Sequence, residues 1–255
     1  MTKPGLFITL EGLDGSGKTT QHLLLARYLR TRGLPVRETR EPGGTCVGEE
    51  IRRILLADED RGRGQDRGKN KIAPLTELLL MYAARAQHLE EVVRPALAQG
   101  QLVISDRFND ASMAYQGHGR QLGESLVRAL DQIICGRMQP QLTVVLDLPA
   151  RLAIKRARQR ETRVRSKRGR FEAQSIKFHE RVRAGYLAIA RRNPHRVKVV
   201  NATQPIEEVE HQIRRVVDAF LRSSQSSVFS LQWNEPRRAK TESRNDNRKV
   251  RRTED

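Results

Sequence analysis

Cysteines, aromatic residues and long apolar runs are all scarce in this chain of 255 residues, and each scarcity excludes a class of protein. The two cysteines, Cys46 and Cys135, are too few for a disulfide framework and lack the spacing of a zinc site, which favours a reducing cytoplasm. No apolar run approaches the roughly 20 residues of a membrane-spanning helix, and no signal-peptide h-region follows Met1. Aromatic residues make up only 4% of the chain, so we expect a cytoplasmic protein with an aliphatic core.

The net charge of +18 is concentrated in two segments. Residues 222–255 carry nine basic and five acidic side chains with almost no apolar periodicity after Leu231, so we expect a disordered basic tail from residue 222. Residues 1–221 are long enough to form one domain. The other segment, 151–170, has one acid, Glu161, and ten basic residues, which supply half of the net charge: Arg151, Lys155, Arg156, Arg158, Arg160, Arg163, Arg165, Lys167, Arg168 and Arg170.

Short β-like runs alternate with longer helical patterns, which predicts βαβ units. One helical pattern ends at Gly33, and another begins at Pro74 and reaches Gln99, interrupted only at Pro95. Residues 58–71 are rich in glycine and mixed charges and predict an exposed loop insertion. The expected fold class is α/β, a parallel sheet flanked by helices on both faces. Its five predicted strands cover 6–10, 36–39, 102–105, 143–148 and 197–201.

A phosphate-binding loop follows the first predicted strand. The pattern G-x-x-x-x-G-K-T has an apolar run before it and a helical pattern after it, as this motif requires. Its glycines let backbone N–H groups face phosphate oxygens, Lys18 reaches the outer phosphates, and the Thr19 hydroxyl can bind Mg²⁺. A glycine-rich turn that only joins a strand to a helix is the alternative. Nucleoside triphosphate binding is therefore predicted for Gly12, Leu13, Asp14, Gly15, Ser16, Gly17, Lys18 and Thr19.

Two more polar clusters follow predicted strands, residues 40–44 and the pair Asp106 and Arg107. Because ligands of open parallel sheets bind beyond the carboxyl ends of the strands, we expect these clusters and the phosphate loop to meet in one cleft. Phosphoryl transfer needs a metal and positive charge around the transferred group, which Lys18 and Arg107 can supply. Asp106 can orient metal-bound water or the arginines. The alternative for Asp106 and Arg107 is a plain surface salt bridge.

The arginine-rich segment 151–170 fits a clamp on a transferring phosphoryl group or a grip on a nucleic-acid backbone. A solvated basic helix face would account for many of its arginines individually. Phe171 is the only aromatic in or beside the segment, whereas a protein that binds single strands would interleave several stacking rings with the charge. A nucleic-acid-dependent ATPase is therefore the disfavoured alternative, and we do not expect nucleic acid as a partner.

Together these motifs resemble those of bacterial thymidylate kinases over residues 5–221. The resemblance implies a three-layer P-loop NTPase fold with a helical arginine-rich lid at about 151–172. It also implies phosphorylation of dTMP to dTDP for dTTP biosynthesis, with ATP as donor and Mg²⁺ as cofactor, and a homodimer built on helices, for which 74–99 is a candidate. The shared motifs lie at 10–20, 39–45, 82–85, 106–107 and 112–117.

The resemblance assigns phosphate, sugar and metal contacts to individual residues. Asp14 would contact the sugar 3′-hydroxyl or the metal shell, and Glu41 would line the same acceptor pocket. Arg52 and Arg107 would bind the dTMP phosphate, which suits bidentate guanidinium groups. Metal contacts, direct or through water, are implied for Thr19, Asp14 and Asp106.

On the base side, the resemblance implies that Arg85 donates to thymine O4, with Ser112 and Gln116 near the base edge. Tyr115 would lie against the deoxyribose, where its ring leaves no room for a 2′-hydroxyl. Met81 stands where the family commonly has a phenylalanine that stacks on thymine. A thioether also packs on a ring face, so we expect altered affinity and unaltered chemistry.

Members of this family carry a catalytic arginine either inside the phosphate loop or on the lid. Here the loop position is Gly15, which implies the lid arrangement. The catalytic candidates are therefore the lid residues Arg156, Arg158 and Arg160, together with Lys18 and Arg107. Closure of such a lid would exclude water and suppress futile hydrolysis. The insertion 58–71 and the tail 222–255 have no part in this scheme.

Overall fold

The computed structural model describes residues 5–57, 72–164, 171 and 174–231. The predicted loop insertion 58–71 and part of the predicted lid lie outside these residues. The chain divides into two compact units, residues 1–218 and 219–255. The first unit contains the sheet and every side chain predicted for the functional site. Within the described residues, no helix combines the length and the apolar character that crossing a membrane requires.

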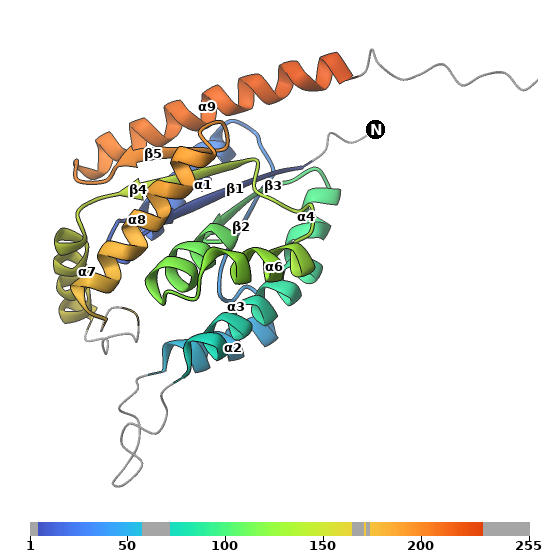
Figure 1. The fold of residues 1–255 in the computed structure, drawn as a ribbon. Helices are drawn as coiled ribbons and strands as arrows, with labels where there is room; N and C mark the ends of the chain where they lie inside the picture. Colours follow the sequence, from blue (N-terminus) through green and yellow to red (C-terminus); the bar gives the residue numbers. More distant parts are fainter. Residues whose placement is uncertain (1–4, 58–71, 165–170, 172–173, 232–255) are drawn as a thin grey trace, which may run out of the picture. The chain divides into compact units, whose positions relative to one another are not determined.

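Five parallel strands form a single sheet in the order β2-β3-β1-β4-β5 (Figure 1). This confirms the predicted α/β fold with a parallel sheet. Each strand lies within two residues of its predicted range. The strands β1, β3 and β4 are buried runs rich in Val, Ile and Leu, which are strong strand signals. The strands are β1 (Leu6–Gly12), β2 (Val36–Arg40), β3 (Leu102–Asp106), β4 (Leu142–Asp147) and β5 (Val197–Asn201).

Helices flank the sheet and supply the outer layers (Figure 1). Side-chain caps begin two of them, with the Thr45 hydroxyl accepting from Gly48 N before α2 and the Ser175 hydroxyl accepting from Phe178 N before α8. Pro74 occupies the first turn of α3, where a missing N–H is tolerated. The α-helices are α1 (Lys18–Thr31), α2 (Cys46–Leu56), α3 (Pro74–His88), α4 (Arg94–Ala98), α5 (Asn109–Ser112), α6 (Glu124–Ile134), α7 (Ala150–Val164), α8 (Ile176–Arg192) and α9 (Ile206–Leu231).

The helix predicted over 74–99 contains a π-helical segment, η2 (Leu89–Val93), between α3 and α4. The prediction of an interruption only at Pro95 is therefore wrong by a few residues. Proline lacks an N–H and its ring meets the carbonyl group four residues earlier, at Glu91. The wider π turn in front of Pro95 accommodates this mismatch without ending the helix. A second π segment, η3 (Met113–Gly119), follows α5.

The final helix α9 continues to Leu231, which corrects the expectation of a disordered tail from residue 222. Residues 222–231 contain neither glycine nor proline, and the first helix breaker of the tail is Pro236. Because adding residues to an existing helix is far easier than starting one, the helix extends through this serine-rich stretch. Residues 232–255 lie outside the described residues.

Strand register brings the predicted polar clusters to the same edge of the sheet. Leu10 of β1 pairs with Asp106 of β3, and Arg40 of β2 pairs with the same Asp106. Gly12, the first residue of the phosphate loop, pairs with Leu146 of β4. The carboxyl ends of the four neighbouring strands β2, β3, β1 and β4 therefore lie side by side, as expected for a ligand cleft in an open parallel sheet.

The core beneath this edge is mainly aliphatic, as predicted, with one aromatic contact at its centre. Phe7 of β1 meets Phe108, after β3, edge to face with ring centroids 4.9 Å apart. Leu89, Val93 and Val103 are buried in the same cluster. These contacts fix the base of the loop that begins at Asp106, from which several predicted site residues extend.

Candidate active site

A cavity of about 480 Å³ lies beyond the carboxyl ends of the strands. The three predicted clusters contribute to it together, which confirms the expectation of one cleft. Phe171, at the end of the predicted lid, also lines it. The predicted site residues that line the cavity are Asp14, Gly15, Gly17, Lys18, Thr19, Glu41, Arg52, Met81, Arg85, Asp106, Arg107, Ser112, Tyr115, Gln116, Arg156 and Arg160.

The phosphate loop leaves β1 and turns directly into α1. Gly17 caps α1 with φ of 91°, and Gly12 has φ of 135°, both in the region that favours glycine. A Cβ atom on Gly12 would come within 2.6 Å of the Leu146 carbonyl oxygen. The loop also packs closely on α7, because a Cβ atom on Gly15 would clash with the carbonyl oxygen of Ala153. The first amides of α1 form a site suited to anions.

Lys18 is buried at the floor of the cavity, with 6% of its side chain exposed. Its Nζ donates to the carbonyl oxygen of Leu13 at 2.9 Å and lies 3.8 Å from Asp14 Oδ1. Burial, with the nearby positive charge of Arg107, lowers the pKa of Lys18 to about 8. The ammonium group is therefore poorly solvated before a ligand binds, so it is well suited to the negative charge of a phosphate group.

Arg107 has φ of 74°, a backbone conformation that side chains other than glycine rarely adopt. Two hydrogen bonds hold it there: its N–H donates to Leu10 O at 3.0 Å, and its carbonyl oxygen accepts from Ser105 Oγ at 2.7 Å. The guanidinium group donates to Asp14 Oδ1 at 2.7 Å and to Gly12 O at 3.0 Å. The strained backbone of Arg107 thus places its guanidinium group in the lining of the cavity.

The pairing of Arg107 with Asp14 changes what the sequence predicts for both residues. A plain surface salt bridge between Asp106 and Arg107 is wrong, because Arg107 pairs with Asp14 and is only 15% exposed. Burial alone would raise the pKa of Asp14, but the charges of Arg107 and Lys18 hold it well below its usual range. The Asp14 carboxylate accepts hydrogen bonds from Arg107 and from the Tyr115 hydroxyl. A sugar hydroxyl that contacted Asp14 would therefore share these oxygens with Arg107 and Tyr115.

Thr19 and Asp106 form an oxygen-rich corner beside the phosphate loop. Thr19 Oγ1 lies 3.4 Å from Asp106 Oδ2, and Asp106 Oδ1 is buried without a hydrogen-bond partner among the described residues. Hydroxyl and carboxylate oxygens are the donors that Mg²⁺ prefers, and it usually takes only one or two protein ligands together with phosphate oxygens. The residues present therefore fit a nucleotide-bound Mg²⁺.

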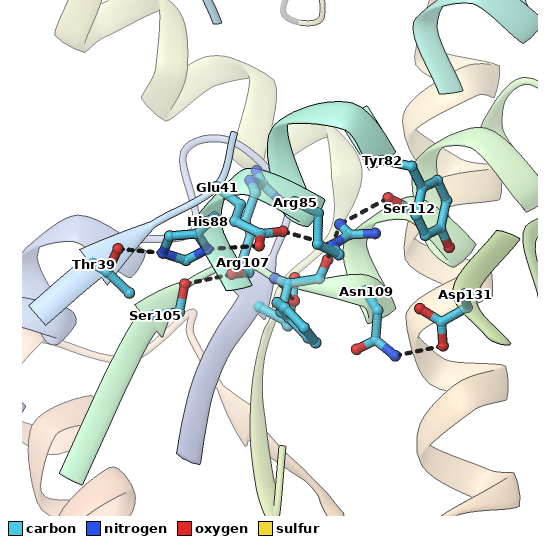
Figure 2. Close-up of polar contacts among 12 residues, drawn as sticks. Thr39, Glu41, Tyr82, Arg85, His88, Ser105, Arg107, Asn109, Ser112 and Asp131 are labelled. Carbon is cyan, nitrogen blue, oxygen red and sulfur yellow. Dashed lines mark hydrogen bonds and ion pairs between the residues drawn. The ribbon is translucent and has the colours of Figure 1, made fainter. Parts of the chain in front are cut away.

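Arg85 lies on α3 at the opposite end of the cavity and is held by three neighbours (Figure 2). Its Nε donates to Glu41 Oε2 at 2.8 Å, and its Nη2 donates to Phe108 O and to Ser112 Oγ, both at 3.0 Å. Nη1 is buried and has no hydrogen-bond partner among the described residues. Glu41 and Ser112 thus orient Arg85 and leave Nη1, with its two N–H donors, available to a ligand.

The other predicted acceptor residues lie around Arg85. Gln116 is buried and lines the cavity, and its Nε2 donates to Glu77 Oε1 at 2.8 Å. Arg52 Nη1 donates to Pro42 O at 2.8 Å. Met81 lines the cavity one turn before Arg85, at the position predicted to face the base.

The predicted lid arginines divide between two places. Arg156 and Arg160 of α7 line the main cavity, but Arg156 donates to the carbonyl oxygens of Ala202 at 2.7 Å and Thr203 at 3.3 Å. Arg158 instead borders a small separate hollow beside Asp14. Of the three, Arg156 and Arg160 therefore line the main cavity, and Arg158 does not. The lid beyond Val164, apart from Phe171, lies outside the described residues.

Sequence reasoning missed three buried polar residues next to this site. Tyr186 of α8 donates to Glu11 Oε2 at 2.8 Å and accepts from Arg107 Nη1 at 3.1 Å. Glu11 also accepts from Phe108 N at 2.8 Å, and His88 bonds to Glu41. Glu11, directly after an apolar run in β1, was the one detectable signal. The spacing of His88 from Arg85 places both on one helix face but does not distinguish a site residue from a core residue.

Glu11 predicts a pH-dependent stability that a glutamine would remove. Burial raises the pKa of Glu11 to about 8 from an ordinary value of 4.5. Between these values the folded chain retains a proton that the unfolded chain releases, so stability from this group is present below about pH 4.5 and is lost as the pH rises through about 8. We expect the free energy of unfolding of Glu11→Gln, relative to the unchanged protein, to rise by about 1.4 kcal/mol per pH unit in this window.

Urea unfolding from about pH 5 to about pH 8 measures this difference. Glu49→Gln is the matched control, because the hydrogen bond from Gly44 N and the charge of Arg40 outweigh its partial burial and lower the pKa of Glu49. Its titration therefore falls below the window, and its stability should run parallel to that of the unchanged protein. A parallel profile for Glu11→Gln as well would contradict the raised pKa of Glu11.

The sheet order, the loop between β1 and α1, and the buried lysine that opens α1 define a P-loop phosphotransferase. The family model described as Thymidylate kinase matches residues 10–213, which is most of the chain. The chain therefore belongs to the thymidylate kinase family, and the resemblance drawn from its motifs is confirmed.

Curated relatives and a solved structure agree with this assignment. A thymidylate kinase of Syntrophotalea carbinolica is 47% identical over 81% of this chain and 92% of its own length. A thymidylate kinase of Pseudomonas syringae pv. tomato is 45% identical over 85% of this chain and 97% of its own. The crystal structure of thymidylate kinase from Ehrlichia chaffeensis superposes with a TM-score of 0.65 at 33% identity, covering 85% of this chain and 99% of that one.

Proposed function

We propose that this cavity transfers the terminal phosphoryl group of ATP to dTMP, giving dTDP for dTTP biosynthesis. One observation carries the proposal: a single cavity joins the phosphate loop to a buried arginine, Arg85, whose Nη1 has no partner among the described residues. The phosphate loop suits a nucleoside triphosphate, and Arg85 suits a base carbonyl. The proposed compartment is the cytoplasm, in keeping with two free cysteines.

On the donor side, the loop amides and Lys18 would bind the ATP phosphates. Thr19 and Asp106 would hold Mg²⁺, which when bound supplies positive charge to the phosphate oxygens. Lys18 is placed to contribute at the outer phosphates, because it lines the cavity and its ammonium group is held against the phosphate loop by the Leu13 carbonyl oxygen.

On the acceptor side, we propose that Arg85 donates from Nη1 to thymine O4 and that Gln116 and Ser112 border the base edge. Met81 would pack on the ring, and Tyr115 would border the deoxyribose. The Tyr115 ring is fixed edge to face against Phe171, with centroids 5.6 Å apart. Such a fixed ring is a rigid wall, which is what exclusion of a 2′-hydroxyl requires.

Between the two sides, Arg107 and Arg52 would hold the acceptor phosphate, and Arg156 and Arg160 of α7 would supply charge to the transferred group. Arg107 stays charged at any pH of interest, and its place in the cavity lining supports a role in stabilising charge during transfer. Lid closure over the cavity would bring the α7 arginines together and exclude water.

A coupled assay of ADP release tests the proposal, with ATP, Mg²⁺ and dTMP, dUMP, dCMP, dGMP or thymidine as acceptor. Selective turnover of dTMP is the expected result. Selectivity for another monophosphate would keep the kinase and overturn the roles of Arg85 and Gln116. Turnover of thymidine in preference to dTMP would overturn the phosphate roles of Arg52 and Arg107.

One arm of the same assay replaces the acceptor with short single-stranded DNA. A nucleic-acid-dependent ATPase would release ADP with DNA alone, and its DNA binding would weaken steeply with salt. We expect no stimulation, because the strand β4 ends in a single acid, Asp147, which pairs with Arg183 at 2.7 Å. Stimulation by DNA in the absence of dTMP would replace the proposed reaction.

We further propose that α2, α3 and α6 form a homodimer interface. The helix α3 packs against both α2 and α6 (Figure 1). Each of the three helices carries a pair of exposed apolar side chains at helical spacing. Apolar pairs on one helix face are commonly covered by a partner. The pairs are Val47 and Ile54, Leu75 and Leu79, and Leu126 and Ile133.

Placing a charge on this face should dissociate the dimer. Leu79 is 49% exposed, and a glutamate there would have to be buried without a partner at the interface. We expect Leu79→Glu to elute as a monomer under conditions in which the unchanged protein is dimeric, as measured by size-exclusion chromatography with light scattering. Leu23→Glu on α1, where the leucine is 59% exposed, is the matched control and should remain dimeric. A dimeric Leu79→Glu protein would place the interface elsewhere.

A further inference from the structure

His88 lies on α3 just behind Arg85, and it is wholly buried. Its two ring nitrogens bridge β2 and the loop that follows it (Figure 2). Nε2 lies 2.6 Å from Thr39 Oγ1, and Nδ1 lies 2.8 Å from Glu41 Oε1. Because the Glu41 carboxylate only accepts, Nδ1 carries the hydrogen and donates. With the hydrogen on Nδ1, Nε2 accepts from the Thr39 hydroxyl, so both ring nitrogens of His88 have a hydrogen-bond partner.

The series of hydrogen bonds that starts at Thr39 and His88 continues from Glu41 to Arg85. Glu41 accepts from His88 on one carboxylate oxygen and from Arg85 Nε on the other. Arg85 lines the cavity, whereas His88 does not. The imidazole therefore acts on the cavity only through the carboxylate. Its contact sets the rotation of the Glu41 carboxylate, and that rotation sets the plane of the guanidinium group.

Close packing around His88 restricts the movement of the hydrogen-bonded side chains Thr39, His88 and Glu41. Gly44 has φ of 82°, and a Cβ atom there would come within 2.8 Å of Thr39 Oγ1 and 2.9 Å of His88 Cδ2. The glycine-rich loop after β2 thus closes directly over the imidazole. The guanidinium carbon of Arg85 lies over the rings of Tyr82 and Phe108, at 4.7 and 5.1 Å from their centroids. These ring contacts and the hydrogen bonds of Nε and Nη2 limit where Nη1 can point.

We infer that His88 is a positioning residue for the acceptor base: through Glu41 it fixes the Arg85 guanidinium group so that Nη1 faces the base carbonyl. This inference rests on the proposed role of Arg85. Without His88, Glu41 keeps its ion pair with Arg85 but loses the contact that fixes its rotation. The consequence falls on recognition of the base, while the phosphate loop keeps its contacts.

Three substitutions separate the two contacts of His88. Asparagine keeps a donor at the δ position, toward Glu41, glutamine keeps a polar group at the ε position, toward Thr39, and leucine keeps neither. We expect His88→Leu and His88→Gln to raise the KM for dTMP by about tenfold or more, as loss of a hydrogen bond to a charged group predicts. The KM for ATP and kcat should change by less than about threefold, and His88→Asn should restore the KM for dTMP to within about threefold.

Base selectivity provides a second readout. Cytosine carries an amino group where thymine carries O4, so a misdirected donor discriminates less between them. We expect the ratio of kcat/KM for dTMP to that for dCMP to fall by about tenfold in His88→Leu and to recover in His88→Asn. A histidine that only fills the core would alter neither this ratio nor the balance between the two KM values.

Two further variants make the outcome decisive. Leu89→Ala, at a buried aliphatic neighbour, should lower the melting temperature at least as much as the His88 variants and leave the KM values for dTMP and ATP in proportion. Arg85→Lys tests the proposed role on which the inference depends. If Arg85→Lys raises the KM for dTMP and His88→Leu does not, the inference is overturned and the proposed function stands. If neither variant raises it, the role of Arg85 itself is overturned.

Discussion

Replacing Lys18 with alanine should lower turnover by about a thousandfold or more at saturating ATP and dTMP. The substitution removes a cation that is buried where negative charge develops during phosphoryl transfer. The ammonium group is held by Leu13 O and faces Asp14 across 3.8 Å, so surrounding groups fix its position before any ligand arrives. Preorganised charge of this kind needs no rearrangement during the reaction. A flexible surface lysine could not replace it.

The loss should be catalytic and not a failure to fold. Burial lowers the pKa of Lys18, which means that the folded chain disfavours its charged form, so removing that charge should not weaken the fold through electrostatics. Lys18→Met keeps most of the buried methylene volume and should have a melting temperature close to that of the unchanged protein. Coupled ADP release and thermal unfolding measure the two properties. Turnover of either variant within tenfold of the unchanged protein would contradict a role in catalysis.

Replacing Arg107 with methionine should damage both activity and stability. The guanidinium group donates to Asp14, to Gly12 O and to the hydroxyl groups of Tyr115 and Tyr186. Its removal leaves the Asp14 carboxylate without its closest cation. Breaking such a largely buried pair costs about 3 kcal/mol of folding free energy. Turnover should fall by about a thousandfold, because the same group lies at the centre of the cavity.

A double-mutant cycle with Asp14→Asn tests the stability part of this prediction. Because the asparagine removes the unpaired charge, the double variant Arg107→Met with Asp14→Asn should unfold at higher urea concentration than Arg107→Met alone. Arg94→Met is the control, since Arg94 is about half exposed and pairs with Glu90 at 3.3 Å on the surface. Its stability should change by less than about 0.5 kcal/mol and its activity not at all. An Arg107→Met protein as stable as this control would sink the prediction.

Local sequence signals account for the sheet and the donor side of the site. The phosphate loop could be predicted because its glycines, its lysine and its threonine are close together in the sequence, with an apolar run before them and a helical pattern after them. The π-helical segment at Leu89–Val93 could not be predicted in the same way. It reflects how a continuous helix accommodates Pro95, and the pattern of apolar residues is compatible with both an α-helix and a π-helix.

Long-range pairs account for what the sequence did not predict. Asp14 and Arg107 were each expected to meet substrate, but they are far apart in the chain and only the folded sheet brings them together. Tyr186 and Glu11 are separated even further, and nothing in the composition of α8 distinguishes this tyrosine from a core residue. His88 falls in the same class. A buried polar side chain is explained by its partner, and the partner is a property of the fold.

The close approach of Gly15 to Ala153 bears on how this family can diverge. A side chain at Gly15 would have to occupy the space that α7 already fills. An arginine in the phosphate loop and a lid helix in this position are therefore alternative occupants of one volume. Any substitution of Gly15 by a residue with a side chain would therefore displace the helix that carries Arg156 and Arg160, so the identity of one loop residue decides where the lid helix can lie.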